Sequence, residues 1–361
     1  MPDTVTVVER VRDAVARGAS VRDAISSEVR RVNERALGAH AAAEIDESDI
    51  TPHVDGFGLL QPLLDDPAIE ELWINGDSEV FVARSGRHER LEITLSTTET
   101  RALVERMLRQ TGRRIDYSQP FVDASLPDGS RLHVVIPPIT RGGWSVNIRK
   151  FSRTLRSLSD LVSVGTLPGS AAAILSTAVR GGSTVLVAGA TQAGKTTLLA
   201  ALCGELPDGE RIITVEETFE LSLPNADVVG MQCRGPSLEG LGEVSLRRLV
   251  RETLRMRPTR IVVGEVRGDE ALDLLVALNS GVPGLCTIHA NSAEHATRKL
   301  STLCQLAGGV SSEFVTETIA STVDVVVHCR MDGDGNRRIT EIARPIVAGA
   351  GIAMERLWSP R

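Results

Sequence analysis

The residues best suited to do chemistry stand together at positions 189–196, which read Gly-Ala-Thr-Gln-Ala-Gly-Lys-Thr. Their spacing is that of the P-loop, G-x-x-x-x-G-K-[ST], whose glycines let successive backbone N–H groups point at one anion. The helix expected from Lys195 adds its positive end to the same place. We therefore predict a loop that binds the phosphates of a nucleoside triphosphate. Its candidate contact residues are Gly189, Ala190, Thr191, Gln192, Ala193, Gly194, Lys195, Thr196 and Thr197.

Two side chains of this loop have separate roles. Lys195 can reach the β- and γ-phosphates, and the Thr196 hydroxyl can ligate Mg²⁺. The alternative is a glycine-rich loop that matches by chance, but an apolar run at 185–187 supplies the strand that the motif requires before it. We accordingly predict ATP as the ligand, Mg²⁺ as its cofactor and Lys195 as a catalytic residue.

Carboxylates follow two other apolar runs. Glu216 comes after residues 212–215, and Glu265 follows residues 261–264. Ligands of open α/β sheets bind beyond the carboxyl ends of the strands, so both acids are expected near the γ-phosphate. Because hydrolysis needs a carboxylate that orients or deprotonates water, both are candidate catalytic residues. For either one, the alternative is a solvated acid at a strand end.

His289 follows a further apolar run, at 284–288. A lone histidine there is either structural or a sensor of the γ-phosphate, and the neighbouring residues leave both interpretations open. We include His289 among the candidate catalytic residues.

Arginines crowd the stretch 247–260, where a helix with an apolar face is expected. Most of them fit a solvated helix face with Glu252 as a partner, whereas one or two could contact phosphate or a neighbouring subunit. The sequence does not say which. They are Arg247, Arg248, Arg251, Arg255, Arg257 and Arg260.

The elements that must position these residues lie in 169–361, where strands and helices alternate as in a mostly parallel sheet. The expected strands are 184–188, 211–215, 227–232, 260–264, 284–288 and 323–329. The pattern predicts an α/β fold of the RecA-like P-loop class.

The rest of the chain divides into three parts. Residues 55–151 predict a smaller α+β domain, with an Asn-Gly turn at 75–76, a helix over 97–110 and strands at 131–136 and 144–150. Residues 152–168, where Ser and Arg alternate, predict a linker. Residues 1–54 predict a helical segment of two short helices, with a poorly ordered tail as the alternative for the first twenty residues.

Composition limits the classes of partner. The net charge of −7 argues against a dedicated nucleic-acid binder, so we expect no direct nucleic-acid partner. The five cysteines are odd in number and widely spaced, which suits reduced thiols of a cytoplasmic protein and supports no zinc site. No apolar stretch approaches the ~20 residues of a membrane span and the N-terminus does not read as a secretory signal, so any membrane association is expected through partners.

Through these motifs the chain resembles the ATPase superfamily of type II secretion, type IV secretion and type IV pilus systems. It looks most similar to the tight-adherence (Flp) pilus ATPases, with the conjugative traffic ATPases next. Residues 213–218 are similar to the superfamily's Asp box, residues 251–268 to its atypical Walker B segment and residues 287–292 to its His box. Two segments of the first domain, 126–131 and 145–150, match those that offer arginines to nucleotide phosphates.

The resemblance implies a role for further residues. Arg131 and Arg149 would contact the nucleotide, and Glu217 would occupy the metal or water position of the Asp box, where Asp is usual. The first domain would be PAS-like. The chain lacks the four-cysteine zinc insert of the type II secretion branch.

The resemblance also implies a homo-hexameric ATPase. Such a ring would work on an inner-membrane platform protein, as a cytoplasmic motor held peripherally at the inner face of the cytoplasmic membrane. Two other functions stay open: a nucleotide-binding scaffold with little turnover, for which Glu217 is the reason, and a RecA-like DNA motor, which the charge and the scarcity of aromatic residues disfavour.

Overall fold

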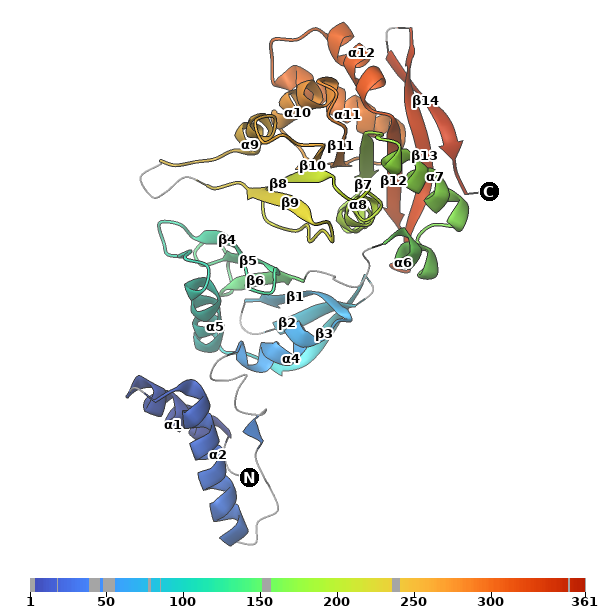
Figure 1. The fold of residues 1–361 in the computed structure, drawn as a ribbon. Coiled ribbons are helices and arrows are strands. Elements are labelled where there is room, and N and C mark those ends of the chain that lie inside the picture. The colour runs from blue at the N-terminus through green and yellow to red at the C-terminus, as the bar shows by residue number, and fades with distance from the viewer. Residues whose placement is uncertain are drawn as a thin grey trace. The chain divides into compact units, whose positions relative to one another are not determined.

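The structure is a computed structural model, which describes residues 4–17, 19–38, 46–47, 56–76, 79–84, 86–150, 157–235, 241–349 and 351–360 (Figure 1). The chain divides into two compact units. The first comprises residues 1–84 and 88–150, and the second comprises residues 85–87 and 151–361.

The two helices expected near the N-terminus are present as α1 (Thr4–Ala16) and α2 (Val21–Gly38). They pack through a small apolar core of their own, formed by Val7, Val8, Val11, Ala24, Ile25 and Val29. The rest of the predicted helical segment falls largely outside the described residues.

The α+β part of the first unit is a six-stranded sheet in the order β3-β2-β1-β6-β5-β4. Its strands are β1 (Ile69–Asn75), β2 (Glu79–Arg84), β3 (Arg87–Thr94), β4 (Phe121–Ser125), β5 (Arg131–Val135) and β6 (Ser145–Arg149). Its helices are η1 (Gly58–Leu60), α4 (Gln61–Asp65) and α5 (Thr97–Arg109), and α5 begins at a capping box of Ser96 and Glu99. Alternate strand residues enter a core shared with α5, so the strand residues between them lie on the other face.

The second unit is an eight-stranded sheet in the order β14-β13-β12-β7-β11-β10-β8-β9, labelled in Figure 1. Neighbours from β12 to β9 run parallel, whereas β12, β13 and β14 pair antiparallel. The strands are β7 (Val185–Gly189), β8 (Arg211–Glu216), β9 (Asp227–Gln232), β10 (Arg260–Val266), β11 (Gly284–His289), β12 (Val325–Met331), β13 (Arg337–Ala348) and β14 (Gly351–Trp358).

Helices cover both faces of this sheet, which explains why its central strands are apolar throughout. One core lies under α9 (Leu246–Thr253), α10 (Glu270–Asn279), α11 (Ala293–Leu306) and α12 (Ser312–Thr322). The other lies under α6 (Leu158–Ser163), α7 (Gly169–Arg180) and α8 (Lys195–Cys203). The α/β class and the six expected strands are therefore confirmed.

Two parts of the second unit differ from expectation. The stretch predicted as a linker contains α6, which begins at a capping box of Ser157 and Asp160 and buries Leu158 and Leu161; residues 152–156 lie outside the described part. The hairpin β13–β14 extends the sheet beyond the last expected strand.

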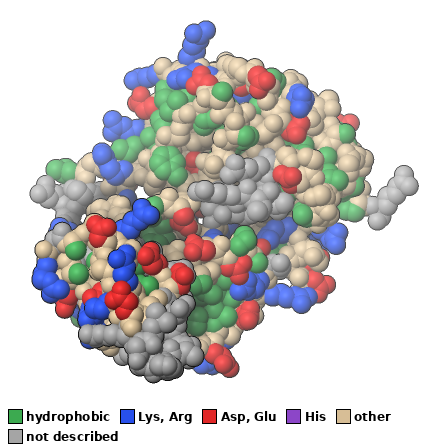
Figure 2. Space-filling model, turned by 60° about the horizontal axis from the view of Figure 1, so that its bottom comes forward, with side chains coloured by type: hydrophobic (Ala, Val, Ile, Leu, Met, Phe, Trp, Pro, Cys, Tyr) green, Lys and Arg blue, Asp and Glu red, His purple; other side chains and the backbone are tan. Residues whose placement is uncertain are grey.

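The surface carries charges of both signs. On the face shown in Figure 2, Lys and Arg side chains are interspersed with Asp and Glu rather than gathered by sign. Among the described residues, we find no helix long and apolar enough to cross a lipid bilayer.

Candidate functional site

The P-loop turn joins the fully buried strand β7 to helix α8, and each of its glycines meets a distinct demand. Gly189 lies against β12, where a Cβ would come 2.5 Å from the carbonyl oxygen of Cys329. Gly194 has a φ of +89° and precedes the first residue of α8, so it leaves that helix without a side-chain cap. Gln192 holds a φ of +63° without being glycine. The turn is thus shaped to direct an uncapped helix N-terminus at an anion.

Lys195 is almost buried at the start of α8. Its ammonium donates to the carbonyl oxygen of Ala190 at 2.9 Å and to Nδ1 of His289 at 3.2 Å. The residue is only 8% exposed. A buried ammonium held by a loop carbonyl and a neutral ring can be drawn away by a more strongly charged acceptor such as a phosphate.

Glu265, His289 and Lys195 form one hydrogen-bonded line. Because Lys195 can only donate, Nδ1 of His289 accepts and Nε2 carries the ring proton. Nε2 then donates to Oε1 of Glu265 at 2.8 Å. Burial and the charge of Lys195 lower the pKa of His289, and the Glu265 carboxylate opposes them. His289 is therefore the neutral middle of the line at pH 7.

Glu265 is brought to His289 by an irregularity in β10. The register with β11 shifts between Val263 and Val266, so the pairing is interrupted at Gly264 and Glu265. The Thr287 hydroxyl donates to the carbonyl oxygen of Gly264 at 2.6 Å. Such interruptions re-aim a side chain, and here the side chain is the carboxylate.

Glu216 lies at the end of β8, but its carboxylate is engaged within its own segment. One oxygen accepts from the Thr214 hydroxyl at 3.0 Å, and the other from the backbone N–H groups of Glu220 and Leu221 at 2.7 and 2.8 Å. Burial raises the pKa of Glu216 to about 7, against these hydrogen bonds. The geometry favours an anchor for the loop that follows β8.

Glu217, the position implied for the metal, forms an ion pair with Arg267 after β10. Both side chains are roughly half exposed. Any metal role of Glu217 would first have to release Arg267.

The arginines of 247–260 have different surroundings. Arg247 and Arg251 both pair with Asp273 of α10 at 2.5 Å, and Arg247 also contacts Asp269 at 2.9 Å. Arg260 is buried and pairs with Glu210 at 3.2 Å. These three therefore have partners inside the unit: Arg247 and Arg251 of α9 pair with acids at α10, and Arg260 of β10 pairs with Glu210, rather than with the expected Glu252.

Arg131 and Arg149 lie in the first unit, directly opposite each other on β5 and β6. They share the sheet face that α5 does not cover, in register with Glu71 of β1. Arg149 is exposed, and no hydrogen bond or ion pair of its side chain occurs among the described residues.

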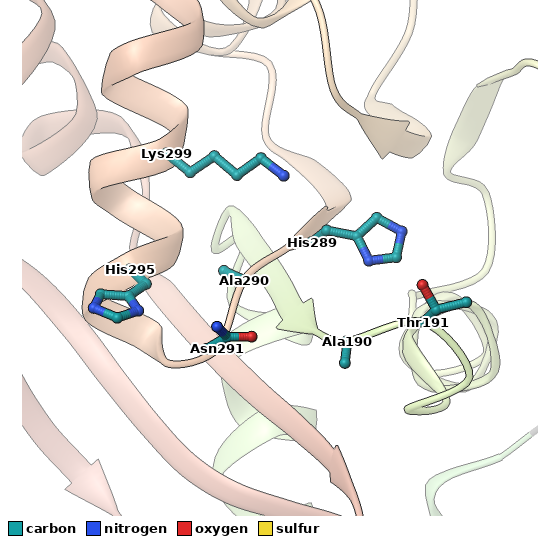
Figure 3. Close-up of a pocket in the computed structure, with 7 residues that line it drawn as sticks. All are labelled: Ala190, Thr191, His289, Ala290, Asn291, His295 and Lys299. Atoms are coloured by element: carbon teal, nitrogen blue, oxygen red, sulfur yellow. The ribbon is translucent and has the colours of Figure 1, made fainter.

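A cavity of about 420 Å³ opens beside the P-loop. Figure 3 shows the residues that line it: Ala190, Thr191, His289, Ala290, Asn291, His295 and Lys299. His295 and Lys299 come from α11, and sequence reasoning missed both because they lie outside every motif.

The groups around the P-loop fit a nucleoside triphosphate and its cation. The uncapped N-terminus of α8 and the Lys195 ammonium supply positive potential, and the cavity gives space next to them. Thr196, in the first turn of α8, is half-exposed and carries a hydroxyl suited to Mg²⁺.

Known proteins are similar to this chain in sequence. The chain is 38% identical over 311 residues to a putative conjugal transfer protein of Mycobacterium tuberculosis (strain H37Rv), and this alignment covers 84% of this chain and 88% of the relative. It is 33% identical over 311 residues to the protein VirB11 of Agrobacterium fabrum (strain C58), and this alignment covers 76% of this chain and 90% of VirB11.

A solved structure shares the fold. The ATPase DotB of Legionella pneumophila matches with a TM-score of 0.55 over 78% of this chain and 79% of that one, at 21% identity. A sequence model of the family described as "Type II/IV secretion system protein" matches residues 53–341. The motifs, the site and these similarities agree, and the chain belongs to the type II/IV secretion system protein family.

Proposed function

We propose that the chain is an ATPase that powers pilus assembly or type II/IV-type secretion. The observation that carries the proposal is the hydrogen-bonded line from Glu265 through His289 to Lys195, which ends on the P-loop. It joins a phosphate-binding cation to a carboxylate that can take a proton from water. A loop that only bound nucleotide would not need the carboxylate.

The roles follow from the contacts. Lys195 would leave Ala190 and His289 for the β- and γ-phosphates of ATP. His289, freed at Nδ1, would keep Nε2–H on Glu265 and hold that carboxylate in place for a water. Glu265 would orient the water and accept its proton. Glu216 would hold the loop that carries Glu217.

The cation would be held by the Thr196 hydroxyl, with Glu217 as a second candidate if Arg267 releases it. Bound Mg²⁺ would neutralise phosphate charge.

The working assembly is proposed from the resemblance. It is a homo-hexamer at the cytoplasmic face of the inner membrane that acts on a platform protein and associates with the membrane through partners. The names of two relatives, a putative conjugal transfer protein and VirB11, support the secretion class. We further propose that the ATPase belongs to the tight-adherence pilus branch and that its first domain is PAS-like.

Steady-state phosphate release from ATP by the full chain tests the proposal. We expect Mg²⁺-dependent release that single-stranded DNA does not stimulate. Nucleotide binding without release would favour the scaffold, and stimulation by DNA would favour the DNA motor.

The ring gives a further prediction. Nucleotide should tighten assembly, because a ring motor places its nucleotides near the neighbouring subunits. Light scattering at micromolar protein and physiological salt, with and without a non-hydrolysable ATP analogue, measures the change. A monomer under both conditions would contradict the ring.

Arg149→Ala tests whether the first unit takes part in binding. A charge-assisted hydrogen bond of about 1.5–3 kcal/mol corresponds to roughly a tenfold to hundredfold loss of ATP affinity. ADP should lose less if the γ-phosphate is the partner. Arg101→Ala is the matched control, because Arg101 pairs with Glu105 on α5, across the sheet. Affinities equal to wild type for both nucleotides would remove Arg149 from the site.

A further inference from the structure

Lysine is rare in this chain. Only three of its 40 basic residues are lysines: Lys150, Lys195 and Lys299. The ammonium of Lys150 donates to the backbone carbonyls of Leu63 and Asp66, and that of Lys195 donates to the carbonyl oxygen of Ala190 in the P-loop. Arginine fills nearly every other cationic position, so each lysine marks a place where a compact ammonium is used instead of a planar guanidinium.

Lys299 has no such partner. It is half-buried on α11, and no hydrogen bond or ion pair of its side chain occurs among the described residues. The acid that precedes it on α11, Glu294, lies five residues earlier and is engaged by Arg298 at 2.7 Å. Partial burial of an ammonium without a counter-charge is unfavourable unless a ligand supplies one.

The surroundings of Lys299 show what that ligand could be. Lys299 lines the same cavity as Ala190 and Thr191 of the P-loop, and in Figure 3 its side chain extends from α11 toward the side where His289 lies. The lining includes no carboxylate. After burial and Lys195, Lys299 is a further cause that lowers the pKa of His289, while Glu265 opposes it. A cavity bounded by cationic and neutral groups next to a phosphate-binding loop suits an oxyanion.

We propose that Lys299 is a further binding residue of the site, which contacts phosphoryl oxygens beyond the P-loop from α11. The oxyanion is the γ-phosphoryl group of the bound triphosphate or the free phosphate formed from it. The inference rests on the proposed function and adds to it a second lysine, supplied by an element outside every motif. Lys195 would hold the phosphates from the loop, and Lys299 would hold the terminal one from the opposite wall of the cavity.

Titrations of Lys299→Ala, Lys299→Arg and wild type test the inference. Each is titrated with a non-hydrolysable ATP analogue and with ADP, and then with inorganic phosphate at saturating ADP. Arg298→Ala is the matched control, because it removes the neighbouring exposed cation of the same helix. Alanine is well tolerated in helices, so Lys299→Ala should fold.

We expect Lys299→Ala to weaken binding of the triphosphate analogue about tenfold, the lower end for a charge-assisted bond. ADP affinity should stay within about twofold of wild type, and Lys299→Arg should recover part of the loss. If phosphate binding with ADP falls instead and the analogue is unaffected, the partner is the free phosphate.

Equal losses for the analogue and ADP, or none for any ligand, would overturn the role of Lys299. Loss of assembly with unchanged affinities would also overturn it and point to a subunit contact. If wild type binds no triphosphate, the proposed function and this inference fail together. If wild type binds and hydrolyses ATP while Lys299→Ala matches it, only this inference fails.

Discussion

Lys195→Ala is expected to lower ATP turnover by about 10³-fold or more. The substitution removes the charge that would stabilise the β- and γ-phosphates, and it also removes the donor that holds Nδ1 of His289. Steady-state phosphate release compared with wild type measures the loss.

The control for this variant is Arg180→Ala, which removes a surface cation of the same unit that pairs with Glu205. It should leave turnover unchanged. Wild-type-like activity of Lys195→Ala would overturn the assignment of the P-loop.

Glu265→Gln should keep ATP binding and lose hydrolysis by about 10²–10⁴-fold. The amide oxygen can still accept from Nε2 of His289, so the geometry of the line should survive, but the amide cannot take a proton from water. Binding is measured with a non-hydrolysable analogue, and turnover is measured separately by phosphate release.

Glu294→Gln is the matched control, since Glu294 is an exposed acid paired only with Arg298 in the described part of the chain. If Glu265→Gln loses ATP binding and turnover together, Glu265 has a structural role in the site and is not the group that accepts the proton of the water.

Local patterns predicted the parts of the site that are built locally. The P-loop needs a strand, two glycines and a helix within a short stretch, and all of these are legible in residues 185–196. The strand-end positions of Glu216, Glu265 and His289 follow from the rule for parallel sheets. The rule does not predict which of the two acids, Glu216 or Glu265, contacts His289.

That choice depends on contacts between distant segments. Glu216 and Glu265 look equivalent in sequence, but only Glu265 meets His289, because β10 is irregular at Gly264. Glu217 pairs with Arg267 fifty residues away, and Lys299 joins the cavity only through the packing of α11. The spacing of residues in the sequence does not predict these contacts.

Two of the elements that the sequence did not predict, α6 and β13, can be explained from their residues. Helix α6 carries a capping box, Ser157 and Asp160, inside a stretch whose Ser and Arg content predicted a linker. Strand β13 contains Pro345, which argues against a strand in a sheet interior. It is tolerated because the pairing of β13 with β12 ends at Ala343, so residue 345 pairs on one side only, with Met354 of β14.

The central claim is that the P-loop and the line from Lys195 to Glu265 form one ATP site. An experimental structure of the full chain with Mg²⁺ and a non-hydrolysable ATP analogue tests it most directly. We predict that the β-phosphate lies at the N-terminus of α8, that Lys195 has left Nδ1 of His289 for the phosphates, and that Glu265 still accepts from Nε2. A nucleotide bound elsewhere, with Lys195 still on Ala190 and His289, would contradict the account.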